Sequence, residues 1–473
     1  MNNLDRVRRY YRNQGYTFAS EAFYTFINMW DSWYRGKVEA YHNMKIYNGE
    51  DFVEREMKKL CMAKKICEDK AGFIINDRLE FNIEKEEAKS RIDNVLADND
   101  FMVEGSQLLE KMYALGTGAM VEFKDAMGGV TIDYIGAFNI IPLTQANENK
   151  INKIAFVSKI DKETYYISEH TYITDESDVY YKQYKIENKK VTIDDDCKFM
   201  SWADLTEQEV ESKVYEVYYS PVKLYQLIKP NIVNNIDIDS KLGISCFANA
   251  IDQLQTVDMN YDSYFEEISN GKSRIFVNEE MAKIKFDENG KPQRYFAKND
   301  TTFYSLKMGN DAKENIIHDI PELRTEQLSG AMCDSLSMLS FKVNLGNGYY
   351  NFKDGKVEKT ATEVISEDSD LYRQVKKDEL VINQALVDMC RAILYLSGED
   401  FNTEIKIKFD DSIVIDDQQL MKDSLLELGA GVIDRIEYFK KVYRMTDEQA
   451  KKKNDEIEAR KPERGDVEVV DFE

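Results

Sequence analysis

Two glycine-bearing segments come nearest to a nucleotide-binding motif in this sequence. Residues 270–273 read Asn-Gly-Lys-Ser, the end of a phosphate-binding loop, but the first glycine of that motif would have to stand at Glu266. A helical pattern, not a strand, precedes them. Residues 116–118 read Gly-Thr-Gly, lack the third glycine of the dinucleotide fingerprint and open a strand. The sequence therefore predicts no nucleotide site, and Gly271 is better interpreted as the end of a helix.

Residues that could bind a metal or transfer protons are scarce or scattered. The chain has 3 histidines and 6 cysteines: His42, His170 and His318, and Cys61, Cys67, Cys197, Cys246, Cys333 and Cys390. No C-x-x-C occurs, and Cys61 and Cys67 lack the spacing of zinc ligands, so we predict no metal site and buried thiols in a reduced, intracellular chain. Residues 194–196 are three aspartates in a predicted turn without partner ligands, which favours a solvated loop over a metal site.

Signatures of hydrolytic enzymes are also missing, since neither G-x-S-x-G nor H-E-x-x-H occurs. We therefore predict that the protein is not an enzyme and has no catalytic residues and no cofactor. The chain contains 87 acidic residues, so paired carboxylates arise by chance. A metal-dependent DNA-processing enzyme such as a nuclease remains an alternative, in which acids at strand ends would surround a divalent ion.

Composition sets the class of protein. A chain of 473 residues is long enough for about three folding units, and 43% hydrophobic residues indicate a folded protein. Its 63 basic residues against 87 acidic ones give a formal net charge of −24, the opposite sign to an ordinary DNA-binding protein. No secretory signal is visible, and no uncharged apolar run reaches the roughly 18 residues of a membrane span. We expect a soluble protein without a membrane partner.

The first half of the chain predicts helices followed by strands. Amphipathic helices are expected at residues 55–75, 86–96 and 104–115, the last ending in the glycines at 116–118. Lysines in the first of them could form a DNA patch, although a solvated helix face explains them better. Strands are expected at 119–123, 130–135 and 140–142, and then at 154–160, 164–168, 171–174, 179–186 and 214–219. We expect an antiparallel insert from 152 to 219, with a turn at Glu187-Asn188.

The second half predicts long helices around a small strand-rich segment. Helices are expected at 245–270, from Pro321 to about 343, and from Thr360 to about 396, where Glu363 completes a capping box. Short strands are expected at 274–277, 283–286, 293–297 and 302–308, with a hairpin turn at Asn289-Gly290. A strand at 404–409 and helices at 418–428, 434–443 and 447–460 follow, and the acidic residues 462–473 are expected to be disordered. The predicted fold class is α+β.

This order of elements resembles the portal proteins of tailed bacteriophages, in particular those of phages with Gram-positive hosts. The segment Lys359-Thr-Ala-Thr-Glu-Val-Ile-Ser-Glu-Asp-Ser-Asp-Leu-Tyr-Arg373 is similar to the start of the long portal helix. The unit from the helix before Gly116-Thr-Gly-Ala-Met-Val to Ile-Ile-Pro142 is similar to the portal wing. The resemblance extends over residues 50–450 and depends on the order of its motifs.

The resemblance implies a portal-like fold with long channel helices, a β-rich wing and a small strand-rich clip. The wing would comprise residues 1–244 and 397–416, with the long wing helix at 360–396. The stem helices would be 245–270 and 321–345, with the clip at 271–320 between them. Residues 346–359 would form the tunnel loop, 417–461 the crown inside the capsid, and 462–473 a disordered acidic tail.

Three sets of site residues follow from these assignments. Acids of the first stem helix would line the channel: Asp252, Asp258, Asp262, Glu266 and Glu267. Such acids would repel DNA and keep it sliding, although a solvent-facing helix would carry the same charges. Tunnel-loop lysines would contact DNA: Lys353, Lys356 and Lys359. The clip tip would dock partners: Asp287, Glu288, Asn289, Gly290 and Lys291. An ordinary surface loop remains the alternative for 346–359.

The resemblance also implies function and partners. About twelve copies would form a ring at one capsid vertex, for genome packaging, head–tail joining and DNA ejection. Double-stranded DNA would pass through the ring, and the terminase large subunit, the head–tail adaptor, and the major capsid and scaffolding proteins would be partners. The protein would be assembled in the host cytoplasm and reside in the virion. Another ring or baseplate component of a phage particle is the structural alternative.

Overall fold

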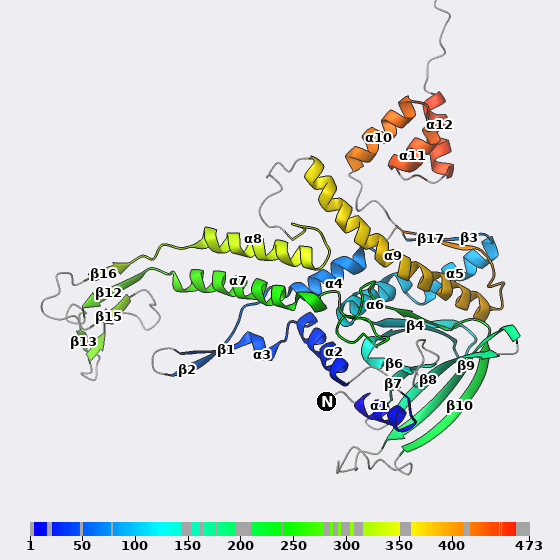
Figure 1. The fold of residues 1–473 in the computed structure, drawn as a ribbon. Helices are drawn as coiled ribbons and strands as arrows, with labels where there is room; N and C mark the ends of the chain where they lie inside the picture. Colours follow the sequence, from blue (N-terminus) through cyan, green and yellow to red (C-terminus); the bar gives the residue numbers. More distant parts are fainter. Residues whose placement is uncertain are drawn as a thin grey trace, which may run out of the picture. The chain divides into compact units, whose positions relative to one another are not determined.

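The computed structural model describes residues 4–16, 21–47, 51–76, 79–143, 153–160, 164–175, 178–193, 210–238, 240–278, 284–286, 292–294, 303–306, 316–350, 361–409, 417–443, 445 and 447–459. The chain divides into two units, residues 1–408 and 409–473, each described by itself. Helices and sheets occur together, so the predicted α+β class is confirmed (Figure 1).

The largest sheet is antiparallel and has the strand order β10-β9-β8-β7-β6. Its strands are β6 (Ile140–Leu143), β7 (Lys153–Lys159), β8 (Thr164–Asp175), β9 (Asp178–Ile193) and β10 (Val210–Ser220). The antiparallel insert predicted from 152 to 219 is thus confirmed, but the turn predicted at Glu187-Asn188 is wrong. Both residues pair within β9, opposite Glu169 and Ser168, and the Asn188 amide donates to Glu216 of β10. Cross-strand partners satisfy these polar side chains, so the strand continues through them.

A short N-terminal helix, α1 (Leu4–Asn13), packs on this sheet and was not predicted. Its buried residues Leu4, Val7 and Tyr11 recur at helical spacing and join the apolar core of β6 to β9. The Tyr11 hydroxyl donates a 2.6 Å hydrogen bond to the fully buried Glu169 carboxylate. The ammonium groups of Lys153 and Lys189 form ion pairs with the same carboxylate.

Glu169→Gln is expected to lower the free energy of unfolding by about 2–4 kcal/mol at neutral pH, because it leaves two part-buried ammonium groups without their counter-ion. Burial raises the pKa of Glu169, but the attraction of Lys189 and Lys153 outweighs it and leaves that pKa below its ordinary value. The stabilisation is therefore present above about pH 4.3, the unfolded value, and is lost as pH falls through the folded pKa.

Urea unfolding of both proteins at pH 7 and at successively lower pH checks this expectation. Glu187→Gln on β9 is the matched control, because the Glu187 side chain is 22% exposed and forms an ion pair with Lys185 on the surface of the same strand. Its effect should stay below about 1 kcal/mol. Equal losses for the two variants, or a Glu169→Gln effect independent of pH, would contradict the account.

A second sheet has the order β11-β4-β5 and lies against the helix that precedes it in the chain. Its strands are β4 (Gly118–Lys124), β5 (Val130–Gly136) and β11 (Tyr225–Ile228). Helix α6 (Phe101–Leu115) ends at Gly116, whose φ of 84° lies in the left-handed region. A Cβ there would also approach the Gly243 carbonyl oxygen to 2.4 Å, so only glycine fits. The predicted helix–glycine–strand unit is confirmed.

Further helices and a pair of short strands belong to the first unit. The helices are α2 (Glu21–Tyr34), α3 (Glu39–His42), α4 (Met62–Gly72), α5 (Glu86–Asp98) and α9 (Ala361–Ser397). Strands β3 (Glu80–Ile83) and β17 (Ile405–Lys408) pair with one another. The segment Leu371–Ser397 of α9 is long and apolar enough by composition to cross a membrane, but 50% of it is buried in the chain, and buried core helices pass the same test. Charged residues interrupt this segment, Asp388 and Arg391 among them, so it is not an uncharged apolar run.

Helix α7 (Ile251–Asn270) and helix α8 (Thr325–Lys342) pack together along much of their length. The strands between them are β12 (Arg274–Asn278), β13 (Ile284–Phe286), β14 (Pro292–Arg294), β15 (Phe303–Leu306) and β16 (Ile316–Asp319). β13 and β14 form the predicted hairpin, while β16 was not predicted. β12 is the central strand of its sheet, parallel to β15 and antiparallel to β16.

The second unit is helical. It contains α10 (Asp417–Gly429), α11 (Arg435–Tyr443) and α12 (Asp447–Ala459), close to the predicted helices. Asp434 and Glu437 form a capping box at the start of α11, since each carboxylate accepts from the other residue's backbone N–H. An ion pair of 2.5 Å joins Lys441 to Glu427 and ties α11 to α10.

Candidate functional site

Helix α7 is the element on which the predicted channel residues converge, and its residues divide into three stripes. One stripe faces α8 and carries the buried Leu254 and Val257. The Asn260 amide donates to the Ala331 carbonyl of α8 at 3.3 Å, which joins the two helices at this level. On α8 the matching buried residues are Cys333, Leu336 and Leu339.

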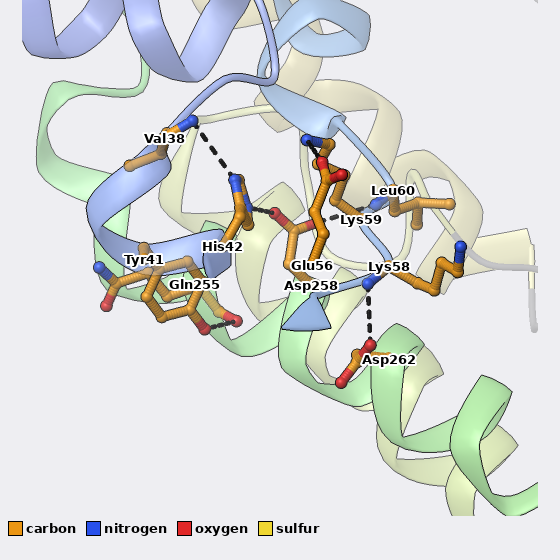
Figure 2. Close-up of polar contacts among 10 residues, drawn as sticks. All are labelled: Val38, Tyr41, His42, Glu56, Lys58, Lys59, Leu60, Gln255, Asp258 and Asp262. Carbon is orange, nitrogen blue, oxygen red and sulfur yellow. Dashed lines mark hydrogen bonds and ion pairs between the residues drawn. The ribbon is translucent and has the colours of Figure 1, made fainter. Parts of the chain in front are cut away.

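A second stripe of α7 holds Asp258 and Asp262, which bind an extended segment some 200 residues earlier in the chain. Asp262 accepts the backbone N–H of Lys58 at 2.8 Å, and Asp258 accepts that of Leu60 at 2.8 Å (Figure 2). The helix predicted from residue 55 is therefore wrong in its first turns. Backbone donors at 58 and 60 are used by carboxylates of α7 instead of by helical carbonyls, and α4 begins only at Met62.

Arg55 completes the contact from β2 (Phe52–Glu56). Its guanidinium donates to both oxygens of Asp262, at 2.8 and 2.6 Å, and approaches Glu266 to 3.2 Å. This forked pair lowers the pKa of Asp262, mainly through the Arg55 hydrogen bond, and raises the pKa of Arg55. The Asp262 side chain is 7% exposed, so the pair is shielded from water on the carboxylate side.

His42, which ends α3, binds the other carboxylate. Its Nε2 lies 3.0 Å from Asp258, and its Nδ1 accepts the Val38 backbone N–H at 3.4 Å. Because Nδ1 accepts, the proton is on Nε2 and the ring donates it to Asp258. Trp33 and Tyr41 pack against the ring edge, so His42 is 2% exposed. This burial makes it a structural donor and keeps it away from solvent.

The third stripe of α7 is open in the described part of the chain. Its exposed residues are Asp252, Thr256, Met259 and Ser263, at intervals of three or four positions, and Asn270 about two helical turns later. The hydroxyls of Thr256 and Ser263 donate to backbone carbonyls one turn earlier. The stripe thus presents a weakly polar surface with Asp252 as its exposed carboxylate.

This arrangement revises the prediction that five acids of α7 line a channel. Asp258 and Asp262 are 4% and 5% exposed and bind the segment 42–60, so we assign them a structural role in place of a channel-lining one. Asp252 lies on the open stripe. Glu266 and Glu267 lie at its border and are paired with Arg55 and Arg324. The sequence did not predict the contacts that His42 and the backbone N–H groups of residues 58 and 60 make with α7. The types and spacing of the side chains around these positions do not indicate such contacts.

The end of α7 is fixed to the start of α8. Arg324 donates through its backbone N–H, Nε and Nη2 to the Glu267 carboxylate, and this lowers the pKa of Glu267 to about 2. Gly271 follows, and a Cβ there would lie 2.0 Å from a methyl of Leu323. Its φ is −77°, so close packing explains the glycine and conformational freedom does not.

The other predicted site residues lie outside the described residues. These are Lys353, Lys356 and Lys359 of the tunnel loop and residues 287–291 of the clip tip. The start of the loop is described: Gly346 and Gly348 have φ values of 85° and 90°, which supports the predicted bends. Tyr350 is anchored by its hydroxyl to Asp69 at 2.8 Å and by its backbone N–H to Ser340 at 3.1 Å. The loop therefore leaves from a fixed point beside α8 and α4.

Within the described ranges, no three histidine, cysteine or acidic side chains are grouped so that they could hold a metal ion. A cavity of about 340 Å³ is lined by Tyr172, Tyr184, Pro221, Val222, Lys223, Asp388 and Arg391. It contains none of the predicted site residues. The candidate functional site is thus the surface of the paired helices α7 and α8, together with the contacts that fix the end of α7 to the start of α8.

Comparisons with known proteins identify one family. A family model described as phage portal protein, SPP1 Gp6-like, matches residues 17–463. No curated protein matches the chain. The chain is similar to a chain in the solved structure "Neck of native GTA particle computed with C12 symmetry", with a TM-score of 0.38 and 10% sequence identity over 80% of this chain and 86% of that chain.

Proposed function

Because this chain belongs to the family of SPP1 Gp6-like phage portal proteins, we propose that about twelve copies form a ring through which double-stranded DNA enters and leaves the capsid. Membership makes the protein a portal, a structural component and head–tail connector at the capsid vertex of a bacteriophage virion. The finer assignments that follow are part of the proposal. The proposal also includes that the protein is not an enzyme and carries no metal or cofactor.

The observation that carries the proposal is the open stripe of α7. The other two stripes are engaged by α8 and by the segment 42–60. The side chains of the open stripe are polar except for Met259 and include no lysine or arginine. Each phosphate contact adds affinity and salt dependence, so a wall without bases suits a duplex that must slide. Asp252, with Glu266 and Glu267 at the border, would add a weak repulsion.

The parts of the proposed portal follow the predicted boundaries. Residues 1–244 and 397–416, with the helix 360–396, form the wing; α7 and α8 form the stem; and 271–320 form the clip. Residues 346–359 form the tunnel loop, whose lysines contact DNA, and 417–461 form the crown. The clip meets the terminase large subunit during packaging and the head–tail adaptor afterwards. Capsid and scaffolding proteins hold the ring during assembly in the host cytoplasm.

The assembly state tests this proposal. A chain of 55.1 kDa should appear as a closed ring of roughly 660 kDa, about twelve copies, in native mass measurements and negative-stain images. Heterologous contacts between copies close into a ring when the rotation permits. A stable monomer at all concentrations and salt conditions, also with scaffold protein present, would overturn the proposal.

Scrambling residues 287–291 is expected to leave the ring intact and to abolish docking of the terminase or of the adaptor. The tip joins β13 to β14, so a change in its sequence leaves the strands and the stem helices unaltered. Native mass measures the ring, and co-sedimentation with each purified partner measures docking. Scrambling residues 125–128, the turn between β4 and β5, is the matched control. Normal packaging and tail joining with the scrambled tip would exclude it as the docking site.

A further inference from the structure

The hairpin of β1 (Asn43–Tyr47) and β2 (Phe52–Glu56) carries large apolar side chains on its surface. Five cross-strand pairs form it, including Ile46 with Val53 and Tyr47 with Phe52. These side chains are exposed to 40% and 48%, and to 58% and 71%. The rings of Tyr47 and Phe52 lie 5.3 Å apart and contact one another. A two-stranded hairpin with both faces exposed is marginally stable in water, so further packing is needed to hold it.

The base of the hairpin, in contrast, is held firmly on α7. Arg55 is bound to Asp262 by two hydrogen bonds, and the Met57 N–H donates to the His42 carbonyl at 2.8 Å, which closes the base. His42 and the backbone at 58 and 60 then bind the α7 carboxylates (Figure 2). The direction of the hairpin is therefore set by the helix.

The charges of the hairpin distinguish between the kinds of partner that could cover its apolar surface. Residues 43–56 contain the acids Glu50, Asp51, Glu54 and Glu56 against the bases Lys45 and Arg55. Lys45 pairs with Glu54 across the strands at 3.4 Å, and Arg55 is used by α7. Nucleic acid and anionic membranes would be repelled, whereas aromatic and aliphatic side chains with few free charges are typical of the core of a protein interface.

We propose that the β1–β2 hairpin is an arm that docks onto a neighbouring copy of this chain through both of its faces, with Ile46 and Val53 on one face and Phe52 on the other. This rests on the proposed function, which places α7 in the wall of a ring. In a ring, a rigid projection from α7 has an adjacent copy at a fixed position, and a contact that is the same at every subunit boundary closes the ring. Phe265 of α7 is 44% exposed, and the Lys58 ammonium lies 5.1 Å from its ring centroid, so a cation of the segment that follows the arm lies over this ring.

A photo-crosslinking amino acid at position 52 tests the arm without any loss of apolar surface. In the assembled protein, illumination should give covalent dimers, and mass spectrometry should find position 52 joined to a peptide of the same sequence in a second chain, shown by mixing isotope-labelled and unlabelled copies. Cross-links only within one chain, or to DNA or another virion protein, would overturn the proposal.

The double variant Phe52→Ser, Val53→Ser gives an independent measurement. It should raise the protein concentration at half-assembly roughly tenfold or more, since every boundary loses two buried anchors. Met127→Ser is the control, because Met127 is 97% exposed in the turn between β4 and β5. An unchanged circular dichroism spectrum and an unchanged midpoint of urea unfolding should show that the double variant is folded and keeps the Arg55 contact at the base of the hairpin. If the wild type forms no ring, the proposed function fails; if the wild type and the double variant assemble equally, only the arm fails.

Discussion

Replacing Asp262 with alanine is expected to lower the free energy of unfolding by about 2–4 kcal/mol, because Asp262 lies on the buried side of α7 that binds the segment 42–60. The change leaves the Arg55 guanidinium and the Lys58 N–H without their acceptor. Since Arg55 holds the pKa of Asp262 below its ordinary value, the stabilisation is present above about pH 4 and is lost as pH falls through the folded pKa.

Asp252→Ala is the matched control on the same helix, because Asp252 is exposed and should change stability by no more than about 0.5 kcal/mol. Urea unfolding followed by tryptophan fluorescence reports the contact, since Trp33 packs against His42 beside the bound segment. Equal effects of the two substitutions would show that the carboxylate of Asp262 does not hold the segment 42–60.

Changing Lys353, Lys356 and Lys359 together to glutamate is expected to leave ring assembly intact and to lower packaged or retained DNA several-fold. On the proposed function, these lysines make weak, salt-sensitive phosphate contacts in the tunnel loop. The loss should grow with falling salt, where repulsion by the new acids is least screened. Purified capsids give the measurement, as DNA content per particle across a range of ionic strength.

The triple change of Lys451, Lys452 and Lys453 to glutamate is the charge-matched control, because these exposed residues of α12 receive the same change in charge. If the tunnel-loop variant forms rings and fills capsids to wild-type density at every salt concentration, the loop is not the DNA contact. Equal losses for both triple variants would indicate an effect of net charge alone.

Local periodicity was sufficient to predict most long elements of this chain. The ends of α7, α8 and α9 and the start of α9 were expected within one residue of their observed bounds, whereas α7 and α8 begin at Ile251 and Thr325, later than the predicted starts at 245 and 321. The glycine at 116 was correctly placed between a helix and a strand. Helix α1 was missed, although Leu4, Val7 and Tyr11 already show the helical spacing of a buried stripe. In these elements the chain's own pattern determines the structure.

Where the prediction failed, a partner distant in the sequence decides the structure. Residues 55–61 have a helical pattern, but α7 offers carboxylates that bind their backbone in an extended form. The same contact buries Asp258 and Asp262, which sequence reasoning placed on a solvent or channel face. Asn188 is a typical turn residue and follows the charged Glu187, yet strands on either side pair with both of them. The charges and the spacing of residues within a segment do not show which residues far away in the sequence will bind it.

A cryo-EM reconstruction of the assembled protein tests the central claim, that the open stripe of α7 faces the channel of a portal ring. The account predicts a closed ring whose lumen is lined by Asp252, Thr256, Met259 and Ser263. Asp258 and Asp262 should point away from the lumen, still bound to the segment 42–60 of their own subunit. A ring with this stripe on its outer surface or buried between copies, or with Asp258 and Asp262 open to the lumen, would contradict the account.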